Sequence, residues 1–133
     1  MLEIGKHSLR DVDFVAVRLR ERNYIDGISR GQKPAYVALS HAWGGAQPFR
    51  LMTENKPLLI RAIRIDDLPR TYRDAIIVTA MLGYSWIWID SMCIIQDSQK
   101  DWEAEALLMG TVYSNCALNL AALDAPNCHQ GLF

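Results

Sequence analysis

The sequence predicts an α/β domain built around a parallel sheet, and two observations lead to this prediction. Segments rich in β-branched and aromatic residues alternate with segments of helical periodicity over residues 36–123, an order typical of βαβ units. The most informative stretch is 85–97, where an apolar run ends on Asp90 and passes into a polar turn that carries Asp97. Buried strands of parallel sheets have this pattern, and in open α/β sheets ligands bind at the carboxyl edge.

Three strands are expected within this region, at residues 36–40, 86–90 and 117–123. Each is a short apolar run bounded by turn-forming residues. A helical segment separates each strand from the next, so right-handed crossovers would make all three parallel. Their carboxyl ends would then meet at one edge of the sheet.

Two helices are expected between these strands. The first begins with Asp67 or Leu68 at its cap and Pro69 in its first turn, and it ends at Gly83. The second is capped by Ser98 and ends near Asn115. Helical spacing gives each a packing face, made of Tyr72, Ala75, Ile76, Thr79 and Ala80 in the first and of Trp102, Ala106, Met109 and Tyr113 in the second.

The domain itself is expected to span residues 36–133, with residues 1–35 as an N-terminal lead-in. Within the lead-in, the alternation from Val12 to Leu19 could form one strand, and Asn23–Lys33 reads as a loop. Residues 46–66 contain two prolines and short apolar pairs. We expect them to form a loop with at most a small hairpin.

Composition and charge exclude several classes of protein. Half of the residues are hydrophobic and 22% are charged, which indicates a globular chain rather than a disordered one. The net charge is −1, and the last third of the chain is acidic without a basic stripe. We therefore expect no nucleic-acid partner. There is no signal peptide and no apolar run of about 20 residues, so we expect a cytoplasmic protein without a membrane partner.

Neither a metal site nor a familiar catalytic motif is predicted. The three cysteines are an odd number without CxxC spacing, and no histidine lies at a finger-like distance from them. Free thiols in a reducing compartment are the expected state. The sequence contains no GxGxxG, P-loop, HExxH or GxSxG motif.

Several candidate binding residues fall at the predicted carboxyl edge. Ser40 ends the first strand, and His41 and Trp43 follow it. Trp43 could stack on a base or pack in the core. Asp90 could orient a ribose hydroxyl, act as a base, or accept backbone N–H bonds in the following turn. Asp97 closes the same turn.

Two further groups could take part in chemistry. Cys93 and His41 would form a thiolate–imidazole pair if their loops meet, although the apolar neighbours of Cys93 favour an inert thiol. Glu105 lies one turn beyond Trp102, on the border of the packing face, from where it could reach into a cleft as a catalytic acid. Glu103 and Glu105 could equally favour the helix dipole.

Five blocks of this sequence resemble the fungal heterokaryon incompatibility (HET) domain. Residues 36–44 read YVALSHAWG and are similar to the opening YxALSYxWG signature, and 68–76 are similar to the second block. Residues 86–97 read WIWIDSMCIIQD and resemble the hallmark WIDxxCIxQD block. The block 101–115 and the final GLF of residues 131–133 follow in the family order. His41 stands where the family usually has tyrosine.

The resemblance implies a fungal signalling domain linked to self/non-self recognition and to programmed cell death. It also implies a distant likeness to TIR domains, and therefore a flavodoxin-like parallel sheet flanked by helices. HET domains continue beyond GLF to a Trp-x-x-Gln-Glu block, whereas this sequence stops at Phe133. We therefore expect a sheet that is incomplete at its C-terminal end. By analogy with TIR domains, the glutamate of that block would be the catalytic acid, so enzymatic activity is uncertain.

Two hypotheses of function follow from the resemblance. The first is an interaction module that signals by associating with itself or with another signalling protein, without a cofactor. The second is a TIR-like NAD glycohydrolase, for which NAD is the substrate and Trp43, Asp90 and Glu105 would stack the base, orient the ribose and stabilise the transition state. A hydrolase using Cys93 and His41 is a remote third hypothesis.

Overall fold

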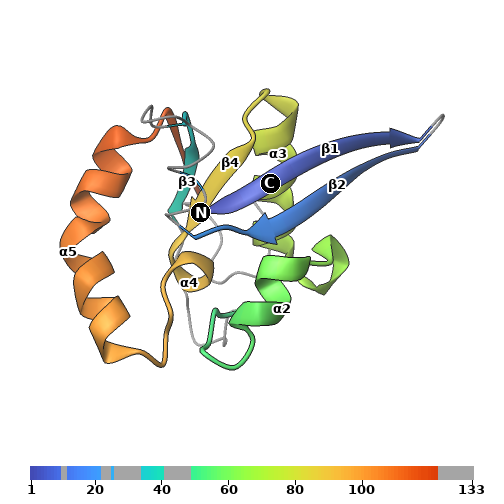
Figure 1. Ribbon diagram of the computed structural model, residues 1–133. Helices are drawn as coiled ribbons and strands as arrows, with labels where there is room; N and C mark the ends of the chain where they lie inside the picture. The colour runs from blue at the N-terminus through green and yellow to red at the C-terminus, as the bar shows by residue number, and fades with distance from the viewer. Residues whose placement is uncertain (10–11, 22–24, 26–33, 41–48, 123–133) are drawn as a thin grey trace.

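The chain folds around one mixed five-stranded sheet with helices on both sides. The computed structural model describes residues 1–9, 12–21, 25, 34–40 and 49–122. The strands are β1 (Leu2–Leu9), β2 (Val12–Leu19), β3 (Val37–Ser40), β4 (Trp86–Ile89) and β5 (Leu118–Ala121). The helices are α2 (Lys56–Arg61), η1 (Ile65–Asp67, 3₁₀), α3 (Arg70–Met81), α4 (Asp90–Cys93) and α5 (Gln99–Asn115). In Figure 1, α5 lies on one side of β3 and β4, and α3 lies on the other.

The three strands predicted from the sequence are present and parallel. The sheet order is β2-β1-β4-β3-β5, and β3 pairs in parallel with both β4 and β5. In one row across these strands, Trp88 lies beside Ala38, and Ala38 lies beside Asn119. Because side chains alternate along a strand, this row faces α5 while the rows that contain Ile87 and Ile89 face α3.

The predicted α/β class is confirmed, and the N-terminal residues add two antiparallel strands to the parallel part of the sheet. The predicted strand at Val12–Leu19 is confirmed, and it pairs along its whole length with β1. At its base, β1 joins β4 through the pairs Leu2↔Ile87 and Glu3↔Trp86. The rest of the hairpin projects away from the helices (Figure 1). The first 19 residues thus contribute two strands to the sheet.

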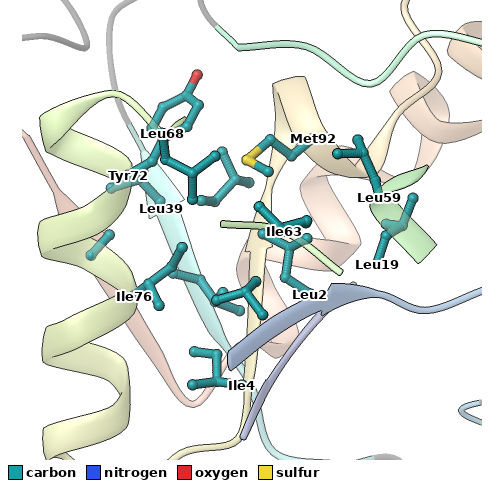
Figure 2. Close-up of a cluster of buried hydrophobic side chains, with 14 of the residues drawn as sticks. Leu2, Ile4, Leu19, Leu39, Leu59, Ile63, Leu68, Tyr72, Ile76 and Met92 are labelled. Atoms are coloured by element: carbon teal, nitrogen blue, oxygen red, sulfur yellow. The ribbon is translucent and has the colours of Figure 1, made fainter. Parts of the chain in front are cut away.

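The main hydrophobic core fills the space between the sheet and helices α2 and α3. Figure 2 shows side chains from β1, β2, β3, α2, α3 and α4 converging there. Tyr72 is fully buried in this core, and its hydroxyl lies 2.7 Å from Ser91 Oγ, the side chain of another fully buried residue. This hydrogen bond satisfies two buried polar groups and ties α3 to α4. All five residues of the packing face predicted for α3 are buried: Tyr72, Ala75, Ile76, Thr79 and Ala80.

Gly83 ends α3 with a φ of +89°, as its position in the sequence predicts. A side chain at this φ is strained even though there is open space around the position. We expect Gly83→Ala to lower the free energy of unfolding by about 1 kcal/mol, measured by urea denaturation. Gly110 lies within α5 and also faces open space, so Gly110→Ala is the matched control and should raise stability by up to about 1 kcal/mol. Equal effects of the two substitutions would contradict this assignment.

The prediction of a loop with at most a hairpin in residues 46–66 is wrong for the described part. Residues 56–61 form α2, and residues 65–67 form η1. Pro57 lies in the first turn of α2, where a missing N–H is not needed, so a residue taken as a loop signal begins a helix. The cap of α3 is Pro69 itself, one residue after the predicted position.

Helix α5 has the predicted bounds but packs more loosely than its sequence suggests. Ser98 accepts a hydrogen bond from the Asp101 N–H, which confirms the predicted cap. None of the residues of α5 is fully buried. Trp102, assigned to the packing face, is 49% exposed. Tyr113 does pack as predicted, with its ring edge-on to Trp88 at a centroid distance of 5.4 Å.

Candidate functional site

The polar residues after β4 form a turn held by hydrogen bonds within itself. Asp90 begins the short helix α4, and its Oδ1 accepts the N–H of Ser91 at 2.7 Å. The carbonyl oxygen of Asp90 accepts the N–H of Ile94. The side-chain amide of Gln96 donates to the carbonyl oxygens of Ile94, at 2.8 Å, and Asp90, at 3.3 Å. Asp90 therefore has the turn-forming role that its position allows.

Asp97 braces this turn against a neighbouring loop. Its Oδ1 accepts the backbone N–H of Thr53 at 2.8 Å and the Thr53 hydroxyl at 2.9 Å. The hydrogen bond from the Thr53 N–H lowers the pKa of the Asp97 carboxyl below its usual value. Leu51 adds two backbone hydrogen bonds to the same turn, with Ser91 and Gln96. In the structure, Asp97 therefore binds Thr53 and connects the turn to the neighbouring loop.

A second group of polar side chains lies at the carboxyl ends of β3 and β5. Ser40 Oγ donates to Asn119 Oδ1 at 3.1 Å. Tyr113, from α5, donates its hydroxyl to the carbonyl oxygen of Leu39 at 3.4 Å. Burial raises the pKa of the Tyr113 phenol, and the nearby Asp90 carboxylate raises it further. Ser40, Asp90, Asn119 and Tyr113 therefore gather on the α5 side of this edge.

Cys93 is under the electrostatic influence of the two carboxylates that the sequence singled out, Asp90 and Glu105. Burial raises the pKa of the Cys93 thiol, and the carboxylates of Asp90 and Glu105 add to this effect. A raised pKa keeps the thiol protonated at neutral pH, which is opposite to what a nucleophilic cysteine needs. His41, its proposed partner, and Trp43 lie outside the described residues. The structure thus brings Asp90 and Glu105 near the same group.

A cleft of about 840 Å³ opens between α5, the sheet and the base of the N-terminal hairpin. Trp88 and Tyr36 line it from the sheet, Glu105 and Val112 line it from α5, and Cys93 lies in its wall. This volume is within the range of small-molecule sites. The Tyr36 hydroxyl donates to the carbonyl oxygen of Val112 and so joins the two walls.

The two walls of the cleft differ in charge. Glu105 and Asp101 come from α5, whereas Arg20 and Lys56 line the opposite side. The cationic groups are paired, since Arg20 forms an ion pair with Glu3 and Lys56 Nζ lies 2.6 Å from an oxygen of Glu21. The Asp101 carboxylate accepts the N–H of Ile95 at 2.8 Å. The cleft can therefore offer an acidic wall and aromatic surface to a polar ligand.

Sequence reasoning placed Glu105 in a cleft but missed Asn119 and Tyr36 as members of the site. Asn119 lies between two leucines in β5, and such alternation indicates a strand with one polar face. That signal could have placed the Asn119 side chain beside Ser40. Tyr36 precedes β3, and its role depends on a contact with α5 that is 76 residues away in sequence.

The raised pKa of Tyr113 gives a prediction for alkaline stability. The folded protein favours the neutral form of the Tyr113 phenol. The phenol therefore stabilises the fold fully at pH values below its unfolded pKa of about 10. This stabilisation is lost as the pH rises through the higher pKa of the phenol in the folded state. We expect the free energy of unfolding to fall more steeply above pH ~10 in the unmodified protein than in Tyr113→Phe. Urea denaturation at a series of pH values tests this. Parallel curves for the two proteins would contradict the assignment.

The described part of the chain contains neither a membrane helix nor a metal cluster. None of its helices is long and apolar enough to cross a membrane. Within the same residues, no three His, Cys, Asp or Glu side chains are grouped so that they could hold a metal ion.

The fold defines this chain as an α/β domain. Its central strand leads into a turn that carries acidic residues and is held by hydrogen bonds. Residues 36–133 match the family model described as Heterokaryon incompatibility protein (HET). The chain belongs to the HET family, as its motifs predict. No curated protein and no solved structure matches it.

Proposed function

We propose that this chain is a signalling domain of the heterokaryon incompatibility type, which promotes fungal cell death through contact with another protein molecule. Family membership supports this proposal, and one structural observation gives it a physical basis. The helix α5 is held on the sheet without a fully buried residue, and Leu107, on this helix, is 86% exposed. Apolar side chains left in solvent on a folded domain are typical of contact surfaces.

Inducible expression in fungal hyphae tests the proposed function. The full chain should cause uptake of a vital dye once it accumulates. A variant with a destabilised core, Ile87→Ala, is the control for non-specific toxicity of the polypeptide, since Ile87 is fully buried. The proposal would be overturned if hyphae stayed fully viable while they contained more of the folded chain than the control hyphae contain of the Ile87→Ala variant.

The cleft supports an alternative, a TIR-like NAD glycohydrolase. Trp88 could contact the base or the nicotinamide ring, and Glu105, on the opposite wall, could stabilise the positive charge that develops on the ribose. Asp90 is not among the residues that line the cleft, so its contact with a ribose hydroxyl would require the ligand to extend to the turn after β4. Water would then add to the ribose carbon as the bond to nicotinamide breaks, giving ADP-ribose, nicotinamide and a proton.

Nicotinamide release from NAD by concentrated, purified protein tests this alternative. If Glu105 has this role, Glu105→Gln should lower the rate by about 10²-fold or more. Glu103→Gln is the matched control, because Glu103 is an exposed residue of the same helix, and its rate should be unchanged. Absence of release from the unmodified chain would exclude the hydrolase, and equal rates in both variants would exclude the role of Glu105. Loss of release in Cys93→Ala would instead favour a cysteine mechanism.

A further inference from the structure

The C-terminal half of α5, the strand β5 and the residues between them contain no charged residue. No residue from Ala106 to Ala122 is charged, although 22% of the residues in the chain are. We call the exposed residues of this segment the α5–β5 surface. It includes Leu107 and Leu108 on the helix, which are 86% and 38% exposed. Leu118, which is 37% exposed, lies in the row of β5 that faces the α3 side, so the uncharged region continues onto the other face of this edge. A long uncharged segment normally belongs to a core, yet here its residues are largely in solvent.

Strand β5 lies at one end of the sheet that the described residues form. It pairs with β3 on one side and ends the strand order. Ala117 donates its N–H to the carbonyl oxygen of Tyr36. Since the amides of successive residues in a strand point to opposite sides, those of Leu118 and Leu120 point away from β3. This side of β5 presents a row of donors and acceptors to a further strand.

This edge lacks the features that normally prevent pairing between molecules. Edge strands of soluble proteins commonly carry lysine, proline or a bulge. The strand Leu118–Ala121 contains no proline and no charge, and none of its four residues is buried. Its chemistry therefore allows pairing, and no other strand of the described residues pairs with this side of β5.

We propose that two copies of this chain associate by antiparallel pairing of their β5 strands across a two-fold axis. The inference rests on the proposed function, since it names the surface through which such a domain would signal. A second copy is the favoured occupant because an uncharged surface offers no counter-charge to an acidic or basic partner, whereas it meets an identical surface without repulsion. The backbone edge is also self-complementary under two-fold symmetry.

The placement of charge on α5 agrees with this arrangement. The acidic residues of the helix, Asp101, Glu103 and Glu105, lie in its N-terminal half. Two helices related by an antiparallel strand pair run in opposite directions. The opposite directions would keep the acidic half of one helix away from the acidic half of the other.

Sedimentation velocity over protein concentrations of about 1–100 µM tests the proposal. The full chain should shift from monomer to dimer as the concentration rises. Ala121→Lys places a charge on the edge strand of each copy, beside the partner's apolar residues, and should raise the dissociation constant by about tenfold or more. Met81→Lys is the matched control, because Met81 is 78% exposed on α3 and its substitution should leave the dissociation constant unchanged.

Circular dichroism establishes whether each variant is folded. If Ala121→Lys does not fold, Leu118→Lys is a second variant that places a charge on the same edge strand. A dimer that neither edge variant weakens would overturn the surface while leaving the proposed function intact. A monomer at every concentration would overturn the inference and leave the edge to another occupant, such as residues 123–133 or a different protein. Death of hyphae in the presence of such a monomer would show that the proposed function survives this failure.

Discussion

Replacing Ile87 with alanine should lower the free energy of unfolding by about 2–5 kcal/mol. Ile87 is fully buried at the centre of the sheet, where its neighbours on the two adjacent strands are Leu2 and Val37. Removing its side chain would open a cavity between the sheet and α3, and close-packed surroundings fill such a cavity incompletely. The loss is large relative to the marginal stability of a domain of this size.

Equilibrium urea denaturation measures this effect. Ile77→Ala is the matched control, because Ile77 is 42% exposed on the outer side of α3. Its loss should be well under half of the loss at Ile87. Similar losses for the two variants would contradict the assignment of the core to the α3 side of the sheet.

Replacing Trp88 with alanine should lower the free energy of unfolding by about 3–5 kcal/mol and should loosen α5 in particular. Trp88 is 4% exposed and makes the edge-on ring contact with Tyr113. The contacts between α5 and the sheet are few, since none of its residues is fully buried. A single large side chain therefore contributes a large part of the packing on this face.

Hydrogen exchange of backbone amides can separate this effect from global unfolding. In Trp88→Ala, amides of α5 should exchange much faster than in the unmodified protein, while those of α3 should change less. In Ile87→Ala the two helices should respond together, because the main core supports the whole fold. Equal acceleration of α3 and α5 in Trp88→Ala would show that α5 is not a separately anchored element.

The sequence predicted the parallel part of the fold because its signals are local. The helix 70–81 begins next to Pro69 and ends before Gly83, and both residues act through their own backbone. The strand Trp86–Ile89 is fully buried, and its run of β-branched and aromatic residues is typical of such strands. These elements need no knowledge of distant contacts.

The parts of the fold that were missed depend on pairing between distant segments. Strand β1 lies in a stretch with weak alternation, and its place is fixed by antiparallel pairing with β4, more than 80 residues later in the chain. The exposure of Trp102 also has a tertiary origin. The helical period places this residue on the inner face of α5, yet its side chain is 49% exposed in the folded structure.

The candidate site was predicted in part. Glu105 lines a cleft, and Asp90 lies at the carboxyl end of a central strand, as their positions in the sequence suggest. The bond between Asp97 and Thr53 could not be foreseen, because Thr53 lies in a segment without a clear structural signal. The contacts of Tyr113 with Trp88 and Leu39 likewise require the helix to be placed on the sheet.

The central claim is that this HET domain signals by self-association through the α5–β5 surface. The most direct test is the viability of hyphae that express either Ala121→Lys or Met81→Lys at the same level as the unmodified chain. We expect Met81→Lys to kill as the unmodified chain does, and Ala121→Lys to leave hyphae viable although it is folded. Equal killing by the two folded variants would contradict the claim.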